Sequence, residues 1–211
     1  VGPMVAVKDR QNALKNPYAH LRLEDISIES VKASPMMWDP LRFLESCPSS
    51  DGACAMVFTD QAGGEAAAKD GRPPAWVLGS AMRSEPFGFP GRDPVLPQGA
   101  RDCADDVYAQ AGITRPREQI DCAELYVPFS WYEPMWLEAH HLAGAGEGWQ
   151  LVESGATALD GSFPVNMSGG VLSSNPIGAS GLLRFAEAAL QVRGMAGEHQ
   201  VDGAKVAVAQ A

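Results

Sequence analysis

Short apolar runs alternate with helix-forming segments over most of this chain, and this alternation restricts the folds that are open to it. Apolar runs of strand character cover residues 53–60, 75–82, 121–129 and 205–211. Segments that are rich in alanine, or that carry apolar residues at helical spacing, lie between them at residues 61–71, 100–113, 131–144 and 178–193. Such alternation predicts an α/β fold with a mixed, mostly parallel sheet and flanking helices.

The first 50 residues differ in character from the rest. Apolar positions at helical spacing predict a helix near the start, which ends at Asn16-Pro17. Prolines interrupt the sequence that follows, which predicts an irregular surface excursion. We therefore divide the chain into residues 1–50, a helix with an irregular loop, and residues 51–211, an α/β unit. Residues 83–100, dense in proline and glycine, are expected to form a loop.

Composition argues against several classes of function. The net charge is −10 and no basic patch with interleaved aromatic residues occurs, which argues against nucleic-acid binding. No apolar run reaches the roughly 18 residues of a membrane span, and no signal-peptide pattern is present, so we expect a cytoplasmic protein without membrane contact. The cysteines fit neither a CxxC nor a Cys/His zinc spacing, so we expect reduced thiols and no metal site at Cys47, Cys54, Cys103 and Cys122.

The most informative stretch is the glycine- and serine-rich segment "NMSGGVLSSNPIGASG", residues 166–181, which directly precedes a predicted helix. A glycine-rich turn before a helix can bind an anion through backbone N–H groups and the helix dipole. The segment is neither a P-loop nor a GxGxxG motif, because the lysine and the glycine spacing are missing. The alternative is a tight crossover whose glycines serve packing alone.

Tyr126 is predicted to lie at the end of a strand, where loops of α/β sheets carry chemistry. Its hydroxyl can act as a donor or a proton carrier there. A buried aromatic cluster is the alternative, and the aromatic residues of 129–136 can equally form a dimer or partner surface. We interpret His140 and His141, near a helix C-terminus, as structural. Cys47 has no visible adjacent base, so we interpret it as unreactive.

Four motifs in this order resemble the C-terminal half of the thiolase superfamily, in its lipid-transfer-protein branch of sterol-carrier-type thiolases. They are "NALKNPYA", "SDGACAMVFTD", "LYVPF" and "NMSGGVLSSNPIGASG". The resemblance covers essentially the whole chain and implies a thiolase-like fold of two similar halves, of which this chain is the second. The terminal Cys-x-Gly segment of thiolases would follow Ala211, so we expect this chain to be part of a longer protein.

The departures from the thiolase pattern indicate a different chemistry. The Gly-His-Pro of a working thiolase, whose histidine activates the nucleophilic cysteine, is here Ser174-Asn175-Pro176. An amide cannot accept a thiol proton at neutral pH, so general-base duty is lost at this position. The thiolase Asn-Glu-Ala-Phe motif appears as "YVPF", with Tyr126 in the place of the asparagine. Claisen chemistry by the usual route is therefore predicted to be disabled.

The resemblance is to the aldolases of the branch, which cleave steroid side-chain CoA esters to a ketone and a short acyl-CoA. It implies a retro-aldol cleavage of a β-hydroxyacyl-CoA, with no cofactor besides the CoA thioester that is the substrate. Tyr126 and Asn175 are the expected catalytic residues, as base for the β-hydroxyl and as stabiliser of the enolate. The expected substrate-binding residues are Gly169, Gly170, Ser174, Pro176 and Gly178.

The same resemblance implies a homodimer and a small OB-fold partner subunit of the DUF35 type. Two other functions stay open from the sequence. One is a 3-ketoacyl-CoA thiolase that draws its base from elsewhere, and the other is a noncatalytic protein that binds a lipid or an acyl-CoA.

Overall fold

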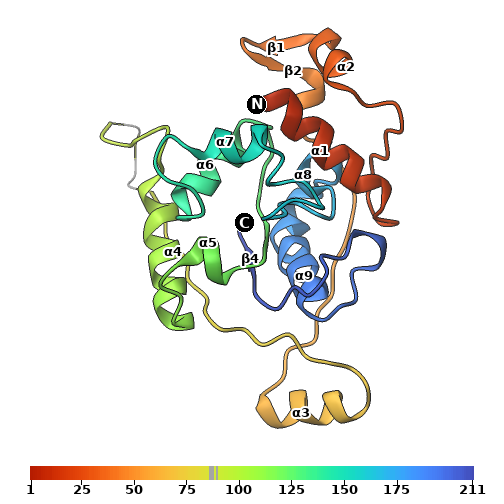
Figure 1. Ribbon diagram of the computed structural model, residues 1–211, viewed down its shortest axis with the longest axis vertical. Coiled ribbons are helices and arrows are strands. Elements are labelled where there is room, and N and C mark those ends of the chain that lie inside the picture. Colours follow the sequence, from red (N-terminus) through yellow and green to blue (C-terminus); the bar gives the residue numbers. More distant parts are fainter. Residues whose placement is uncertain (86–87, 89) are drawn as a thin grey trace.

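The structure is a computed structural model that describes residues 1–85, 88 and 90–211, and it has the predicted α/β character (Figure 1). Its α-helices are α1 (Gly2–Leu14), α2 (Ile28–Ala33), α3 (Gln61–Lys69), α4 (Gln98–Ala111), α5 (Pro116–Gln119), α6 (Tyr132–Ala139), α7 (Gly148–Glu153), α8 (Gly170–Ser173) and α9 (Ser180–Val192). Three short 3₁₀ turns are η1 (Phe43–Glu45), η2 (Ile177–Ala179) and η3 (Gly197–His199). The strands are β1 (Met36–Trp38), β2 (Leu41–Arg42), β3 (Cys122–Glu124) and β4 (Ala207–Ala209).

The central layer consists of short parallel segments, with β3 in the middle. β4 pairs with β3 in parallel register, with Cys122 opposite Ala207. On the other side of β3, a parallel bridge joins Ala123 to Val165. The strands predicted at 121–129 and 205–211 are therefore present, though shorter than expected. The excursion after α1 contains α2 and the antiparallel hairpin β1–β2, so it is more regular than its prolines indicated.

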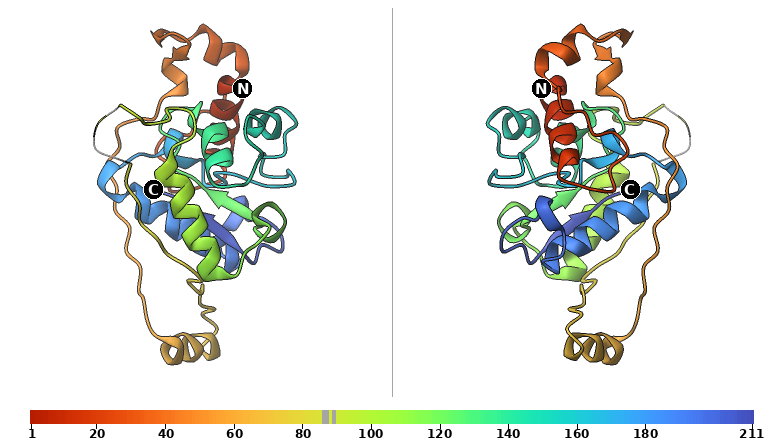
Figure 2. Two further views of the ribbon diagram at one scale, coloured as in Figure 1. Left: turned by 90° about the vertical axis from the view of Figure 1, so that its left-hand side faces the viewer. Right: turned by 90° about the vertical axis from the view of Figure 1, so that its right-hand side faces the viewer.

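The predicted strands at 53–60 and 75–82 are not strands in this structure. Both segments run as extended chain to and from α3, which stands at the far end of a long arm (Figure 2). Their apolar side chains are open to solvent: Val57 is 95% exposed and Met82 is 87% exposed. A strand needs the N–H and C=O groups of a neighbour, and the described residues provide no ladder for either segment. The strand-type composition of these two segments was therefore not enough to predict a strand.

The predicted helices are all found; most are shorter than predicted, and α4 keeps its length but is shifted by two residues towards the N-terminus. Segment 131–144 gives α6, which ends at Ala139 because His141 adopts a left-handed backbone conformation with φ of 55°. The loop expected at 83–100 ends where α4 begins, and its residues 86, 87 and 89 lie outside the described residues. No helix in the described part of the chain is both long enough and apolar enough to span a membrane.

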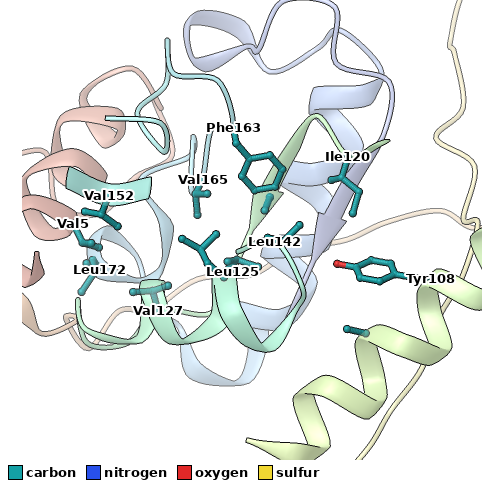
Figure 3. Packing of buried hydrophobic residues seen from close by; sticks show 13 residues of the cluster. Val5, Tyr108, Ile120, Leu125, Val127, Leu142, Val152, Phe163, Val165 and Leu172 are labelled. Carbon is teal, nitrogen blue, oxygen red and sulfur yellow. The ribbon is translucent and has the colours of Figure 1, made fainter. Parts of the chain in front are cut away.

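The main hydrophobic core lies beside β3. Leu125, Leu142, Phe163 and Val165 are at most 1% exposed, and Figure 3 shows them pointing into a shared interior. Full burial of one such side chain stabilises the fold by about 1.5–3 kcal/mol. The core therefore fixes the end of β3, from which Tyr126 follows.

A buried ionic cluster joins α1 to this core. The Lys8 ammonium lies 2.6 Å from Asp9 Oδ1 and 3.0 Å from Glu133 Oε2, and it donates to the Val165 carbonyl at 2.7 Å. Asn166 Nδ2 donates to Asp9 Oδ2 at 3.3 Å. Burial raises the pKa of Asp9 to about 7, although the charge of Lys8 works to lower it.

We predict that replacing Asp9→Asn flattens the dependence of stability on pH. The folded state holds the Asp9 proton more tightly than the unfolded chain does, whose aspartates titrate near about 4. Asp9 therefore makes stability fall as pH rises from about 4 to about 7. Urea unfolding of both proteins at pH 5 and pH 7.5 measures this. A variant that loses as much stability over this interval as the wild type would contradict the assignment.

Candidate functional site

The glycine turn of the 166–181 segment lies directly against α1. Gly169 and Gly170 have positive φ angles of 90° and 58°. A Cβ on Gly169 would stand 2.5 Å from the Cβ and 2.8 Å from the Cα of Ala13. A side chain cannot be placed there, so the close packing against α1 requires a glycine at this position. Its predicted contribution to substrate binding stays a prediction.

Two side chains fix the amide of Asn175, which is only 3% exposed. Ser180 Oγ donates to Asn175 Oδ1 at 2.8 Å, and Asn175 Nδ2 donates to Cys47 Sγ at 3.1 Å. The amide nitrogen carries two hydrogens, so one N–H remains for a further acceptor. The arrangement provides a directed hydrogen-bond donor and no proton acceptor.

Cys47 is the site residue whose position the sequence did not reveal. Its N–H donates to the Pro128 carbonyl at 2.9 Å, while its sulfur accepts from Asn175. The thiol thus lies between the segment that follows Tyr126 and the loop that carries Asn175. Its partner is an amide rather than a base, in line with the interpretation that it is not an activated nucleophile. Because 128 positions separate Cys47 from Asn175, no local pattern could have indicated their contact.

Tyr126 follows β3 as predicted, and its backbone is held on both sides. Its N–H donates to Gln210 Oε1 at 2.9 Å, and its carbonyl accepts from Trp136 Nε1 at 2.7 Å. The side chain is half-buried. Tyr126 and Asn175 belong to two segments that meet at Cys47.

The aromatic residues of this region contact one another, but Tyr132 is exposed, so they do not form the buried cluster that was the alternative here. Tyr132 lies 6.2 Å from Phe129 and 5.8 Å from Trp136 between ring centroids, and Trp136 stacks on His140 at 5.9 Å. Burial, together with the nearby His141, lowers the pKa of His140 to about 4, so this imidazole is neutral at pH 7. Its ring packs on Trp136.

The other predicted binding residues occupy three different settings. Ser174 Oγ accepts a hydrogen bond from the His20 N–H at 2.8 Å. Pro176 packs on Gly52, where an added Cβ would stand 2.9 Å from the proline Cγ. Gly178 lies in η2, is exposed, and has open space around it.

A second buried polar network supports the start of the loop. The carboxylate of Glu124 forms an ion pair with Arg184, and it accepts from the N–H and the hydroxyl of Ser168, each at 2.9 Å. Burial raises the pKa of Glu124, against the effect of Arg184. Next to it, His199 Nε2 lies 3.0 Å from Glu187 Oε2. This network joins β3, the loop and α9, and nothing in the local sequence indicated it.

The described residues hold no group of three or more His, Cys, Asp or Glu side chains that could bind a metal ion. A hollow of about 580 Å³ lies away from Asn175; its lining includes Arg101, Arg117, Glu138 and His141. Neither this hollow nor a second one, beside α1, is lined by Tyr126 or Asn175.

Two of the loop glycines give a matched pair of tests. We predict that Gly169→Ala destabilises the protein by about 1–3 kcal/mol, because the new methyl group meets the α1 backbone at a strained φ. Gly178→Ala should change stability by less than about 0.5 kcal/mol, because nothing lies within 4 Å of the added Cβ. Thermal unfolding measures both. Equal effects of the two substitutions would show that the packing against α1 is not what requires a glycine.

The chain matches the profile of the family described as "Thiolase C-terminal domain-like" over residues 89–211. It is 33% identical to human "Sterol carrier protein 2" over 205 residues, which is 95% of this chain and 37% of that protein. It is 32% identical to the "17-hydroxy-3-oxo-4-pregnene-20-carboxyl-CoA lyase" of Mycobacterium tuberculosis over 200 residues, 90% of this chain and 49% of the lyase. The chain thus spans about half or less of the length of these relatives.

The fold agrees with this relationship. The solved structure titled "Ltp2-ChsH2(DUF35) aldolase" superposes with a TM-score of 0.81 at 24% identity, over 99% of this chain and 54% of the matched chain. The α/β architecture is therefore thiolase-like, with small sheets. The chain belongs to the thiolase C-terminal domain-like family, and its relatives include sterol-carrier-type proteins.

Proposed function

We propose that the protein is a carbon–carbon lyase that cleaves a β-hydroxyacyl-CoA by a retro-aldol reaction to a ketone and a shorter acyl-CoA. One observation carries the proposal. The family resemblance places the thiolase base at Asn175, and the side chain there is an amide that Ser180 and Cys47 hold in one orientation. Such an amide can donate to an oxyanion but cannot accept a proton.

The retro-aldol reaction requires a base for the β-hydroxyl and a hydrogen-bond donor for the enolate oxygen. A base takes the proton of the β-hydroxyl, and the electron pair of that O–H bond becomes the ketone C=O bond. The bond between the α- and β-carbons breaks, and its electrons form the thioester enolate. The free N–H of Asn175 donates to the enolate oxygen. A proton from solvent then reaches the α-carbon, so the reaction needs neither free CoA nor a covalent cysteine.

Tyr126 is the proposed proton acceptor for the β-hydroxyl. It follows the end of β3, and its backbone is fixed by Gln210 and Trp136. A phenol must be deprotonated, or must pass its proton through water, to serve as a base near neutral pH. The other half of a thiolase-like fold and a partner subunit would contribute the remaining environment.

The relatives support the substrate class and the partner. The mycobacterial relative is named as a lyase of a pregnene-20-carboxyl-CoA, so we propose a steroid side-chain CoA ester as the substrate. The structural neighbour is titled as an aldolase with a DUF35 component, so we propose an OB-fold partner of this type. We also propose a homodimer, as the family resemblance implies, and a cytoplasmic location.

We predict that Asn175→Ala lowers kcat for ketone release by about 10²–10³-fold, as loss of an oxyanion donor does. Tyr126→Phe should lower kcat by about 10²–10⁴-fold, which is the usual contribution of a general base. Substrate binding, measured by calorimetry, should change little in either variant. Both measurements use the full-length protein with its DUF35-type partner and a branched β-hydroxyacyl-CoA.

Tyr18→Phe is the matched control, because Tyr18 is 87% exposed and should turn over substrate at the wild-type rate. A Tyr126→Phe variant with wild-type kcat would exclude Tyr126 as the proton acceptor. Asn175→Ala with unchanged kcat would exclude the amide as the enolate stabiliser.

A further inference from the structure

We propose that Ser50, held by a hydrogen-bond contact with His20, is a positioning residue that fixes where the Asn175 amide lies during the reaction. This inference rests on the proposed function, because it concerns the same amide. Ser50 and His20 belong to two segments that are far from the loop in sequence. Both segments come to the side of the loop where the backbone of Asn175 lies.

Ser50 binds both backbone polar groups of Asn175. The N–H of Asn175 donates to Ser50 Oγ at 3.1 Å, and the N–H of Ser50 donates to the Asn175 carbonyl at 3.3 Å. These are two hydrogen bonds between residues 125 positions apart. They fix the peptide planes before and after Asn175, and with them the direction of its Cα–Cβ bond.

His20 holds the hydroxyl of Ser50. Its Nδ1 lies 2.8 Å from Ser50 Oγ, and its own N–H donates to Ser174 Oγ at 2.8 Å. The next residue, Leu21, donates its N–H to the Ser173 carbonyl at 2.9 Å. Since Ser50 Oγ already accepts from Asn175, its own proton is free for Nδ1 of a neutral His20. The imidazole thereby fixes the rotation of the hydroxyl that accepts from the loop.

The two sets of hydrogen bonds together set the position of one atom, Nδ2 of Asn175. Ser180 and Cys47 fix the rotation of the Asn175 amide, while Ser50 fixes the backbone from which that amide extends. Together they determine where the remaining N–H points. A displacement of about 1 Å in a catalytic group can cost about 10²-fold in rate. Ser50 is therefore expected to act on kcat rather than on substrate binding.

A kinetic effect can be separated from a folding effect at these positions. His20 is exposed and Ser50 is only half-buried, so neither contributes much to the apolar core. Ser50→Ala leaves the N–H of Asn175 without its acceptor, so thermal unfolding first establishes that each variant is folded. Ser49, the exposed neighbour of Ser50, has no hydrogen bond among the described residues and provides a matched control.

The test uses the full-length protein with its partner and a β-hydroxyacyl-CoA. Ser50→Ala should lower kcat by about 10–100-fold with KM within about threefold. Ser50→Thr retains the hydroxyl and should recover kcat to within about threefold of the wild type, and Ser49→Ala should match the wild type. His20→Ala should lower kcat less than Ser50→Ala does. Because an asparagine side chain can replace the Nδ1 acceptor, His20→Asn should restore most of this loss.

A second readout does not depend on turnover. Asn175 Nδ2 donates to Cys47 Sγ, so a displaced Asn175 leaves this thiol less protected. Alkylation of Cys47 by iodoacetamide, followed by peptide mass spectrometry, should be several-fold faster in Ser50→Ala than in the wild type or in Ser49→Ala. An unchanged alkylation rate, or a wild-type kcat in folded Ser50→Ala, overturns the proposal. If the wild type releases no ketone, the proposed function fails and the alkylation rates alone decide the role of Ser50.

Discussion

Helix α1 holds the two segments that form the site, the loop that carries Asn175 and the segment that carries Cys47. On one side, Asn12 Nδ2 and Asn16 Nδ2 donate to the carbonyls of Asn166 and Ser168 at 3.1 and 2.9 Å, which fixes the start of the loop. On the other side, Arg10 Nη2 donates to the carbonyls of Leu44 and Ser46 at 3.2 and 3.1 Å, directly before Cys47. The contact between Cys47 and Asn175 therefore depends on one rigid helix.

In the proposed function, the chemistry of the site follows from an amide, Asn175, at the place where the family resemblance puts the imidazole of a thiolase. A histidine can take a proton and so activate a nucleophile, whereas an asparagine can only donate and accept hydrogen bonds. The surrounding ion pairs add orientation at a desolvation cost, as the buried Glu124–Arg184 pair does for Ser168. Preorganised donors of this kind stabilise developing negative charge without further rearrangement. Under the proposed function, such a donor stabilises the enolate that the cleavage forms.

The sequence predicted the parts of the fold that depend on local patterns. Helices α1, α3, α4, α6 and α9, the strand before Tyr126 and the family relationship followed from periodicity and short motifs, whereas the shorter helices α2, α5, α7 and α8 were not predicted. The strands at 53–60 and 75–82 were wrong for this chain, because strand formation requires a partner that a local pattern does not specify. A packing role for the loop glycines was one of two alternatives, but the contact of Gly169 with Ala13 was not predicted.

The contacts of the site could not be predicted, because they join residues far apart in sequence. Cys47 and Ser50 reach the loop from one part of the chain and His20 from another, across 125 or more positions. Their residue types are common, and no spacing marks them. Only the folded arrangement of α1 and the loop brings them to Asn175.

The most direct test of this account is to follow the cleavage of a branched β-hydroxyacyl-CoA by the full-length protein and its partner in D₂O, without free CoA. The account predicts release of the ketone together with a shorter acyl-CoA that carries one deuterium at its α-carbon. Turnover of a 3-ketoacyl-CoA alone, and only when CoA is added, would contradict it and assign the protein to the thiolases by activity.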